Sequence, residues 1–378
     1  MLPTKEGLAG LMSKRKIRLY QGFDPTGSRL HLGHSIGLRK LMDFANLGHE
    51  VIFLFGTGTV LVGDPSLRDS GRKGITQEEI EKNIKDWKRQ AAPLVDFEKV
   101  AIKQNGDWLV PLTLKDIIKI ASNISALQLF KRDMFQRRLR RGDTVWYHET
   151  MYPLLQGYDS VVMDVDLEVG GTDQEFNMLI GRDLQRKMNN KEKYVLCTPM
   201  ILGTDGKQMS KSSGNCVWLD DSPQDMFGKI MSMPDNQTVP YLTLVTNLPL
   251  PRVSEIESSL KSKEMHPMEA KRLCAWEVVK DFHGRKAADK AAEEFRETFQ
   301  EGKLPDNIPT VAIKAKTLVP ADLLCSAKLA SSKSHARRLI KQGGVRIDGL
   351  VLKDEKTPIR VTKGMLIQVG KRTHAKIA

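Results

Sequence analysis

The sequence predicts an α/β protein that begins with a parallel sheet and ends with a small α+β module. Two observations predict the sheet. The run VIFLFGTG (residues 51–58) is continuously apolar and ends in glycines, as a buried parallel strand does. It follows a short β-rich run, IRLYQGF (residues 17–23), and a segment with apolar residues at helical spacing (residues 32–48). Strand, turn, helix and strand at this spacing indicate a βαβ unit.

The middle of the chain mixes helices with further strands. TQEEIEKNIKDWKRQ (residues 76–90) predicts a helix with a capping-box start, and residues 112–158 have a mostly helical pattern. Strand signals return near residues 166–169 and 194–202. EGKLPDNIPT (residues 301–310), rich in Pro, Gly and Asn, is typical of a linker.

These patterns divide the chain into four expected parts. Helical patterns dominate from Pro223 to about Gln300, which separates a helical domain from the sheet before it. The expected bounds are 1–219 for the parallel-sheet domain with a helical insertion at about 112–158, 220–300 for the helical domain, 301–316 for the linker and 317–378 for a basic module.

Composition limits the class of protein. The chain of 378 residues is 40% hydrophobic, and no apolar run approaches the roughly 20 residues of a membrane span. The N-terminus has no long apolar segment before a cleavage site, although its short basic start is also compatible with an organelle transit peptide. Four widely spaced cysteines give no CxxC pair, and we predict no metal site and no disulfide framework. We therefore expect a cytoplasmic protein without a membrane partner.

The positive charge is concentrated at the C-terminal end. Residues 317–378 contain 13 Lys and Arg against 4 Asp and Glu, a local charge of +9 within a total of +13. An excess so local indicates a polyanionic partner; the alternative is charge that serves only solubility.

The turn after the first predicted strand carries a candidate phosphate site. DPTGSRLHLGH (residues 24–34) leads directly into a helix, and helix N-termini bind anions through their free N–H groups. Gly33 permits close approach of a ligand to the backbone, and His31 and His34 can donate hydrogen bonds to phosphate oxygens. The alternative is two surface histidines in an ordinary turn.

A second polar loop supports the phosphate hypothesis. GTDGKQMSKSSGN (residues 203–215) follows a predicted strand and carries Lys207 and Lys211 among glycines and serines. Lysines and hydroxyls on such a loop can fold over a triphosphate during a reaction.

Together the two loops resemble the signatures of class I aminoacyl-tRNA synthetases. HLGH (residues 31–34) resembles their HIGH signature, and QMSKS (residues 208–212) resembles KMSKS, with Gln208 in place of the first lysine. Four further segments resemble the bacterial tyrosyl-tRNA synthetase family in particular. They are YQGFDPTGSRLHLGH from Tyr20, VGDPS from Val62, YPLLQGYDS from Tyr152 and GGTDQ from Gly170.

The resemblance implies a fold, a reaction and partners. It implies a Rossmann-like catalytic domain that activates L-tyrosine with ATP and Mg²⁺, and transfers the tyrosyl group to tRNA(Tyr). It also implies a C2 homodimer through the insertion near residues 112–145. No protein nucleophile is needed, because the carboxylate of tyrosine supplies one, so the protein must align substrates and stabilise charge.

The resemblance assigns roles to residues at the matching positions. The expected catalytic residues are Thr26, His31, His34, Arg68, Arg72 and Lys211. The expected ATP-binding residues are Gly22, Asp24, His31, Gly33, His34, Gly171, Asp173, Ser210, Lys211 and Ser212. The expected tyrosine-binding residues are Tyr20, Asp64, Tyr152, Gln156, Asp159 and Gln174, of which Tyr20 and Asp159 match the pair that binds the phenol.

The basic module resembles a small RNA-binding module that is shared with a ribosomal small-subunit protein and some pseudouridine synthases. Lys333, Arg337, Arg338 and Lys341 recur at roughly helical spacing and are expected to meet RNA phosphates, in the anticodon arm or the long variable arm of the tRNA. KRDMFQRRLRR (residues 131–141) is either a second RNA-facing surface or a solvated helix face.

Three other functions compete with this interpretation. A tryptophanyl-tRNA synthetase would share the fold, but an indole offers only a donor where a phenol offers both donor and acceptor. An RNA-binding protein that has lost catalysis would explain Gln208 but not the intact HLGH and GGTDQ motifs. A cofactor adenylyltransferase of the same superfamily would be shorter and would not need the basic module.

Overall fold

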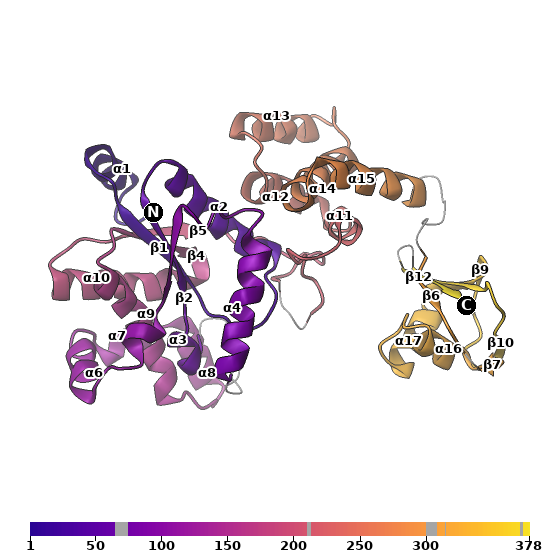
Figure 1. Ribbon diagram of the computed structural model, residues 1–378, viewed down its shortest axis with the longest axis horizontal. Coiled ribbons are helices and arrows are strands. Elements are labelled where there is room, and N and C mark those ends of the chain that lie inside the picture. The colour runs from indigo at the N-terminus through magenta and orange to yellow at the C-terminus, as the bar shows by residue number, and fades with distance from the viewer. Residues whose placement is uncertain (65–74, 210–212, 300–307, 314, 371–372) are drawn as a thin grey trace. The chain divides into compact units, whose positions relative to one another are not determined.

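The computed structural model describes residues 1–64, 75–209, 213–299, 308–313, 315–370 and 373–378. The chain forms two compact units, Met1–Asp289 and Lys290–Ala378, which are drawn together in Figure 1 and are described here one at a time. The finer division into four parts stays a prediction. No helix within the described residues has both the length and the apolar character that crossing a bilayer requires.

The first unit is built on the predicted parallel sheet. Five parallel strands lie in the order β3-β2-β1-β4-β5. Their bounds are Arg18–Phe23 for β1, Glu50–Phe55 for β2, Val100–Gln104 for β3, Leu167–Gly171 for β4 and Tyr194–Thr198 for β5. The expected α/β fold class is therefore confirmed, and four of the five strands match predicted segments. β3 was not predicted, because it lies at the edge of the sheet and only Val100 is buried.

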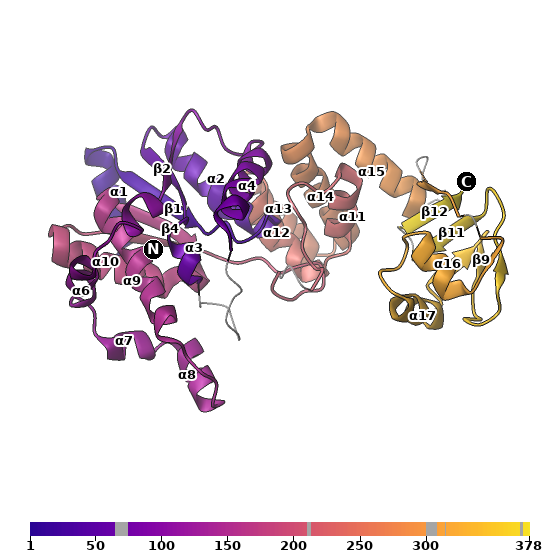
Figure 2. The same ribbon diagram turned by 60° about the horizontal axis from the view of Figure 1, so that its bottom comes forward.

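The order of the strands places a crevice between β1 and β4. The chain moves from β1 to β2 in one direction across the sheet and from β4 to β5 in the other. Right-handed crossovers in opposite directions put their helices on opposite faces. Accordingly, α2 (Leu32–Asn46) and α4 (Gln77–Ala91) lie on one side of the sheet, and α9 (Tyr147–Met163) and α10 (Glu175–Asn189) on the other (Figures 1 and 2). Ligands of such sheets bind at this switch point, at the carboxyl ends of the strands.

Local sequence explains where the two helices on the first face begin. Thr76 Oγ1 accepts from the backbone N–H of Glu79 at 3.2 Å, and a Glu79 carboxylate oxygen accepts from the Thr76 N–H at 2.9 Å, so the predicted capping box of α4 is present. His31 is the N-cap of α2, directly after the turn that follows β1.

Helices fill the rest of the first unit. Those before β4 are α1 (Lys5–Lys14), α3 (Thr59–Val62), α5 (Gly106–Leu109), α6 (Leu114–Ala121), α7 (Ala126–Phe130) and α8 (Asp133–Arg140). After β5 come α11 (Pro223–Met231), α12 (Thr238–Val245), α13 (Leu250–Lys261), α14 (Pro267–His283) and α15 (Arg285–Phe299), the last of which continues past the boundary of the unit. Both the helical insertion and the helical run after Pro223 match the sequence pattern.

The basic run at residues 131–141 is only partly a surface. Arg132 is buried, with its guanidinium 4.7 Å from the ring centre of Phe176. Arg138 is buried as well and forms an ion pair with the buried Glu149 of α9. Two of the arginines that suggested an RNA surface therefore pack the insertion against the rest of the unit.

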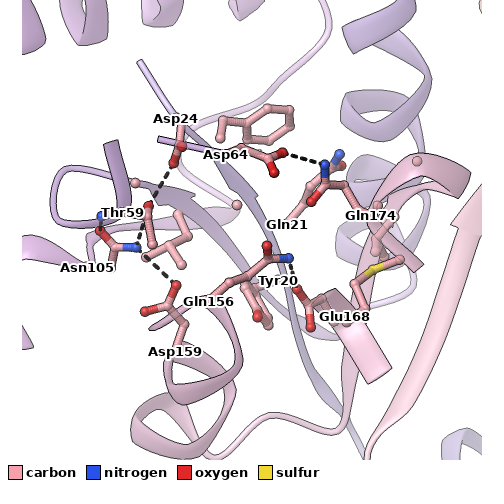
Figure 3. A pocket seen from close by; sticks show the side chains of 18 of the residues that line it. Tyr20, Gln21, Asp24, Thr59, Asp64, Asn105, Gln156, Asp159, Glu168 and Gln174 are labelled. Carbon is pink, nitrogen blue, oxygen red and sulfur yellow. Dashed lines mark hydrogen bonds between the residues drawn. The ribbon is translucent and has the colours of Figure 1, made fainter. Parts of the chain in front are cut away.

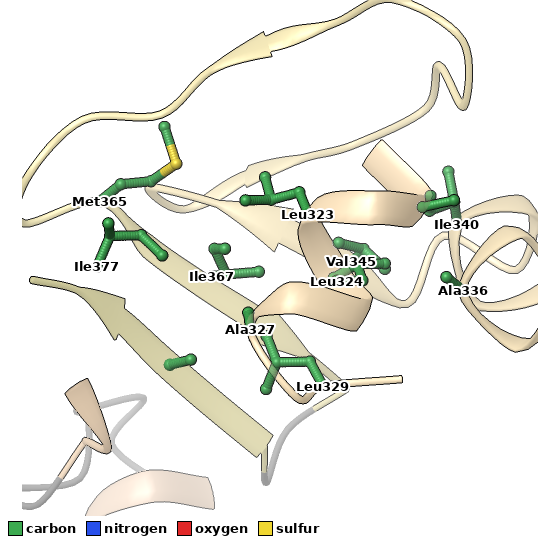
Figure 4. Close-up of a cluster of buried hydrophobic side chains, with 12 residues drawn as sticks. Leu323, Leu324, Ala327, Leu329, Ala336, Ile340, Val345, Met365, Ile367 and Ile377 are labelled. Atoms are coloured by element: carbon green, nitrogen blue, oxygen red, sulfur yellow. The ribbon is translucent and has the colours of Figure 1, made fainter. Parts of the chain in front are cut away.

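The second unit packs two helices on a small sheet. α16 (Pro320–Ser326) and α17 (Lys333–Lys341) lie against a mixed sheet with the strand order β6-β12-β11-β8-β9. Leu323, Leu324, Ile340, Val345 and Ile367 form the centre of its core (Figure 4). β6 (Thr310–Val311) falls within the segment expected as linker and pairs with β12 (Thr373–Ile377). The remaining strands are β7 (Thr317–Leu318), β8 (Val345–Ile347), β9 (Leu350–Val351), β10 (Ile359–Arg360) and β11 (Leu366–Val369).

A buried carboxylate fastens the N-terminal segment to the start of β4. The Asp166 carboxylate accepts from the Arg15 guanidinium at 2.6 and 2.9 Å and from the Arg18 backbone N–H at 2.8 Å. Its side chain is only 2% exposed. Burial alone would raise the pKa of Asp166, but the hydrogen bonds from Arg15 and Arg18 outweigh it and leave the pKa below its ordinary value.

We predict that Asp166→Asn lowers the free energy of unfolding by about 2 to 3 kcal/mol at pH 7, because a charge-assisted pair is lost at a buried site. The pKa of Asp166 is lowered in the fold, so its contribution is present above the ordinary Asp pKa and disappears as pH falls through the folded value. Urea unfolding of the wild type and of Asp166→Asn measures the difference in free energy of unfolding, which should be smaller at pH 3 than at pH 7. Asp164→Asn, at the neighbouring exposed position, is the matched control, and an equal loss in both variants would contradict the prediction.

Candidate active site

A cavity of about 330 Å³ opens at the carboxyl ends of β1 and β4. All six residues expected to bind tyrosine line it: Tyr20, Asp64, Tyr152, Gln156, Asp159 and Gln174. They come from β1, the segment after α3, α9 and the turn after β4, so the topology brings together residues that are far apart in the sequence (Figure 3). Tyr152, Gln156 and Asp159 share one face of α9, as their spacing predicts.

Asp159 is a buried carboxylate at the floor of this cavity. Its two oxygens accept hydrogen bonds from the Asn105 amide at 3.0 Å and from the Trp108 indole N–H at 2.8 Å. Burial raises the pKa of Asp159 well above its ordinary value, and these two hydrogen bonds oppose that rise. Asn105 and Trp108 were not predicted, because neither lies near a recognisable motif in the sequence.

A chain of hydrogen bonds connects Asp159 to the opposite wall of the cavity. The Asn105 amide also donates to Thr59 Oγ1 at 3.0 Å, and Thr59 donates to Asp24 at 2.7 Å (Figure 3). The Tyr152 hydroxyl donates to the other Asp24 oxygen at 2.9 Å. Asp24 was expected at the nucleotide; in the structure its carboxylate holds Thr59 and Tyr152 in place.

Gln156 presents an acceptor to the cavity. Its amide nitrogen donates to a Glu168 oxygen at 3.1 Å. Because a carboxylate only accepts, this contact identifies the other end of the amide as the oxygen. The amide oxygen is buried and has no hydrogen-bond partner among the described residues. Buried polar atoms are normally paired, so this oxygen is suited to accept from a bound ammonium group.

Gln174 is held by two carboxylates. Its amide nitrogen donates to Asp64 at 2.7 Å and to Asp173 at 3.0 Å, and its oxygen accepts from the Asn177 amide at 3.0 Å. Burial raises the pKa of Asp173, and the hydrogen bond from Gln174 opposes this. Gln174 was expected to face a substrate carboxylate. To donate to that group, its amide nitrogen would have to leave Asp64 or Asp173.

A second cavity of about 290 Å³ adjoins the first and shares several walls with it, including His31 and His34. It brings the expected nucleotide residues Gly33, Gly171 and Asp173 together with Gln208 of the second loop. Gly22 and Thr26 line the first cavity instead. The structure therefore joins the two predicted loops at one place.

The two histidines of HLGH face each other at the start of α2. Their ring centres are 3.9 Å apart, and the backbone N–H of His31 donates to His34 Nδ1 at 3.1 Å. His34 Nδ1 also lies 3.1 Å from the His31 carbonyl oxygen, so the backbone of His31 holds the His34 ring in place. A Cβ at Gly33 would lie 3.0 Å from His31 Nδ1, so a glycine lets the His31 ring fold back over the helix start.

Gln21 is a wall of both cavities that sequence reasoning missed. A Cβ at Gly37 of α2 would lie 2.1 Å from Gln21 Oε1, so the glutamine occupies space that this glycine leaves open. Gln21 Oε1 is buried without a hydrogen-bond partner in the described structure. The signal in the sequence was its position between Tyr20 and Gly22, both of which were predicted.

Asn215 fastens the base of the second loop. Its amide nitrogen donates to Asp205 at 2.8 Å and to the Gln208 carbonyl at 3.0 Å, and its own carbonyl accepts from the Thr204 N–H. The expected residues Ser210, Lys211 and Ser212 of this loop, and likewise Arg68 and Arg72, lie outside the described residues.

The four residues expected to bind RNA are all exposed on α17 of the second unit. Two of them form ion pairs within the unit: Lys333 with Asp322 at 2.6 Å and Lys341 with Glu355 at 3.7 Å. Arg337 and Arg338 lie between them on the helix.

Sequence comparisons agree with this architecture. Residues 12–300 match the family model described as tRNA synthetases class I (W and Y), and residues 321–365 match the S4 domain. The chain is similar to a tyrosine–tRNA ligase of Thermotoga maritima, with 40% identity over 100% of this chain and 94% of the relative. It is also similar to a tyrosine–tRNA ligase of Aquifex aeolicus, with 38% identity over 100% of this chain and 95% of the relative.

Solved structures share the fold. A truncated mitochondrial tyrosyl-tRNA synthetase of Aspergillus nidulans superposes with a TM-score of 0.64 at 24% identity, covering 78% of this chain and 89% of that one. A tyrosyl-tRNA synthetase of Archaeoglobus fulgidus, solved with L-tyrosine, gives 0.61 at 22% identity, covering 76% and 94%.

A parallel sheet with paired histidines at its switch point, followed by an S4 domain, defines a class I aminoacyl-tRNA ligase. Within that class, the full-length similarity to curated relatives is decisive. The chain belongs to the tyrosyl-tRNA synthetase family.

Proposed function

We propose that this chain activates L-tyrosine with ATP and then transfers the tyrosyl group to the 3′ end of tRNA(Tyr). In the first step a tyrosine carboxylate oxygen attacks the α-phosphorus of ATP, and the bond to pyrophosphate breaks. In the second step a hydroxyl of the terminal ribose attacks the tyrosyl carbonyl, and AMP leaves. The observation that carries the proposal is the cavity with Asp159 at its floor, in a chain of this family.

The cavity suits a phenol better than a phenyl or an indole group. Asp159 can accept the phenol proton, and the Tyr20 hydroxyl can donate to the phenol oxygen. Phenylalanine has no polar atom for either group, so both hydrogen bonds to the substrate would be lost. At the other end of the substrate, the unpaired oxygen of Gln156 and the carboxylate of Asp64 are suited to the ammonium group.

The adjoining cavity is our proposed nucleotide site. His31 and Thr26 would contact the outer phosphates, and His34 would help to hold the nucleotide. Gly171 and Asp173 would hold the ribose, where a carboxylate accepts from hydroxyls. By the family resemblance, Lys211 with Ser210 and Ser212 would close over the pyrophosphate, with Arg68 and Arg72 opposite.

We assign Mg²⁺ to the phosphates of ATP, where Mg²⁺ is commonly held with several waters. Within the described residues, no group of three His, Cys, Asp or Glu side chains could hold a metal ion. The ion would offset negative charge on the phosphates, and the alignment of the two substrates is left to the residues above.

For the second step we propose that the S4 domain binds the anticodon arm or the long variable arm of tRNA(Tyr). Lys333, Arg337, Arg338 and Lys341 on α17 would meet the phosphates. No Phe, Tyr or Trp lies on this helix, which favours recognition of backbone and shape over base stacking. We further propose that the protein acts in the cytoplasm.

We also propose a C2 homodimer through the insertion. Large apolar side chains are exposed there, among them Leu114 (75%) and Ile118 (59%) on one face of α6, and Leu127 (75%) on α7. Exposed apolar groups this close together are typical of a surface that another chain covers.

The first experiment is pyrophosphate exchange into ATP, run with L-tyrosine, L-phenylalanine or L-tryptophan and without tRNA. We expect exchange with tyrosine only, because only its phenol pairs with both Asp159 and Tyr20. Exchange with tryptophan would overturn the assignment of the cavity to tyrosine but leave the assignment of an aminoacyl-tRNA ligase intact. Folded protein that binds tRNA but gives no exchange would overturn the proposed activation step.

We predict that the preference for tyrosine over phenylalanine falls as pH is lowered from 8 to 5. Burial raises the pKa of Asp159, so its carboxylate takes up a proton above the ordinary range of Asp and then no longer accepts from the phenol as strongly. The pKa of Tyr20 and of Tyr152 is raised by burial, so neither titrates in this range. The ratio of the two kcat/KM values measures the effect. In Asp159→Asn the ratio should be low and independent of pH; a wild-type ratio that is flat with pH would contradict the assignment.

We predict that Ile118→Asp raises the dissociation constant of the dimer by about 100-fold, because a charge would be buried in an apolar interface. Sedimentation velocity at micromolar concentration measures the change. Leu47→Asp, at a residue that is 69% exposed at the end of α2, should leave the dimer intact. A dimer that survives Ile118→Asp would place the interface elsewhere.

A further inference from the structure

A buried lysine lies beneath the phenol end of the cavity. Lys193, directly before β5, is 0% exposed and forms an ion pair with Glu168 of β4, which is 2% exposed. Glu168 lines the cavity; Ser160 of α9 contacts the pair, and Tyr20 of β1 contacts Ser160, and both are 0% exposed. None of the roles proposed above uses Lys193 or Ser160, and Glu168 has served only to orient the Gln156 amide.

The contacts form one path from the ammonium group to Tyr20. Lys193 Nζ donates to Ser160 Oγ at 2.8 Å, and Ser160 Oγ lies 2.9 Å from the Tyr20 hydroxyl oxygen. Ser160 Oγ also lies 3.4 Å from a Glu168 oxygen, a longer contact. The Tyr20 hydroxyl is thus connected to a buried positive charge through a single serine.

The fold makes room for the ammonium group. A Cβ at Gly181 of α10 would lie 2.5 Å from Lys193 Nζ and 3.1 Å from Ser160 Oγ. A Cβ at Gly157 of α9 would lie 3.0 Å from the Gly181 backbone nitrogen. Glycines at these two positions therefore let α9 and α10 approach closely around the ammonium group of Lys193. A side chain at either position would collide with its neighbours.

The direction of the hydrogen bonds follows from the charge of Lys193. An ammonium group only donates, so Ser160 Oγ accepts from it. Ser160 then has its own proton to donate, and the shorter contact is to the Tyr20 oxygen. If Tyr20 accepts from Ser160, the Tyr20 proton is directed away from Ser160, toward Glu168, with which Tyr20 also interacts, or toward a ligand in the cavity that both residues line.

We propose that Lys193 is a positioning residue for substrate selection: through Ser160 it holds the Tyr20 hydroxyl as a donor toward the phenol oxygen of the substrate. The inference rests on the proposed tyrosine specificity of the cavity. The phenol of the substrate then donates its proton to Asp159 and accepts a hydrogen bond from Tyr20. The direction of the Tyr20 hydroxyl is fixed before the substrate binds.

The ion pair itself is poorly explained by stability. Burial lowers the pKa of Lys193, while Glu168 and Asp159 act to raise it, so the ammonium depends on the carboxylates around it. Replacing a buried ion pair with apolar residues of similar size is often neutral or stabilising. A charged pair at this place is better explained by the direction it gives to Ser160 and Tyr20.

The test is a double-mutant cycle in the full-length protein with Lys193→Met, Ser160→Ala and both together. Pyrophosphate exchange gives kcat/KM for L-tyrosine and for L-phenylalanine. We expect each single variant to lower the tyrosine-to-phenylalanine ratio by about 5- to 10-fold, the effect of about one hydrogen bond, mainly through the KM for tyrosine. Because Lys193 acts through Ser160, the double variant should lose no more than Ser160→Ala alone.

Lys191→Met is the matched control. Lys191 lies two residues earlier and pairs with Asp164 and Asp166, at 3.1 and 3.2 Å, away from the cavity. Its ratio should equal that of the wild type. A damaged fold would lower kcat/KM for both amino acids and leave the ratio unchanged, so the ratio separates positioning from general destabilisation.

The proposal is overturned if Lys193→Met keeps the wild-type ratio, or if the losses multiply in the double variant. If Lys193→Met does not fold, Lys193→Met with Glu168→Gln leaves no lone buried charge and is assayed instead, with the same two outcomes. Because Glu168 also contacts Ser160 and interacts with Tyr20, the ratio of this double variant is compared with that of Glu168→Gln alone. Absence of tyrosine exchange in the wild type would refute the proposed function instead, so the two failures are distinguishable.

Discussion

The burial of the Asp159 carboxylate is the constraint on which the rest of the site depends. A carboxylate at this depth is stable only if its oxygens are hydrogen-bonded, and Asn105 and Trp108 serve this purpose from the segment after β3. Glu168 adds a second buried acid nearby, which Lys193 offsets. The strands and helices are therefore held together at the switch point by polar groups as well as by the apolar core. Removing any one of these groups would leave another unpaired.

The sequence predicts the fold class and most of the cavity, because the decisive residues lie in short contiguous motifs. HLGH, GGTDQ and the spacing of Tyr152, Gln156 and Asp159 each depend on one turn or one helix face, which a single segment encodes. Asn105, Glu168 and Lys193 could not be found in this way. The roles of Glu168 and Lys193 arise from the register of β4 beside β1 and β5, and the role of Asn105 from that of β3 beside β2, which no local pattern specifies. In the sequence, Lys193 is one of several charged residues before a strand, a pattern that is typical of an exposed turn.

Charge patterns were informative for the second unit and misleading for the insertion. The concentration of Lys and Arg after residue 317 corresponds to an S4 domain with an exposed basic helix. The equally basic run at residues 131–141 turns Arg132 and Arg138 inward, where one stacks on Phe176 and the other pairs with Glu149. Arginine supports both outcomes, because its planar guanidinium can be buried against a ring or a carboxylate at low cost.

The ion pairs on α17 bear on the RNA binding proposed for this helix. Lys333 and Lys341 already have carboxylate partners, so fewer small cations and anions are exchanged with solvent when they contact phosphates than when a lone lysine does. The slope of log K against log salt concentration is set by the number of ions released on binding, and not by the number of basic residues present. If α17 binds RNA as proposed above, the dependence on ionic strength should be shallower than its composition suggests, and Arg337 and Arg338 should account for most of the slope.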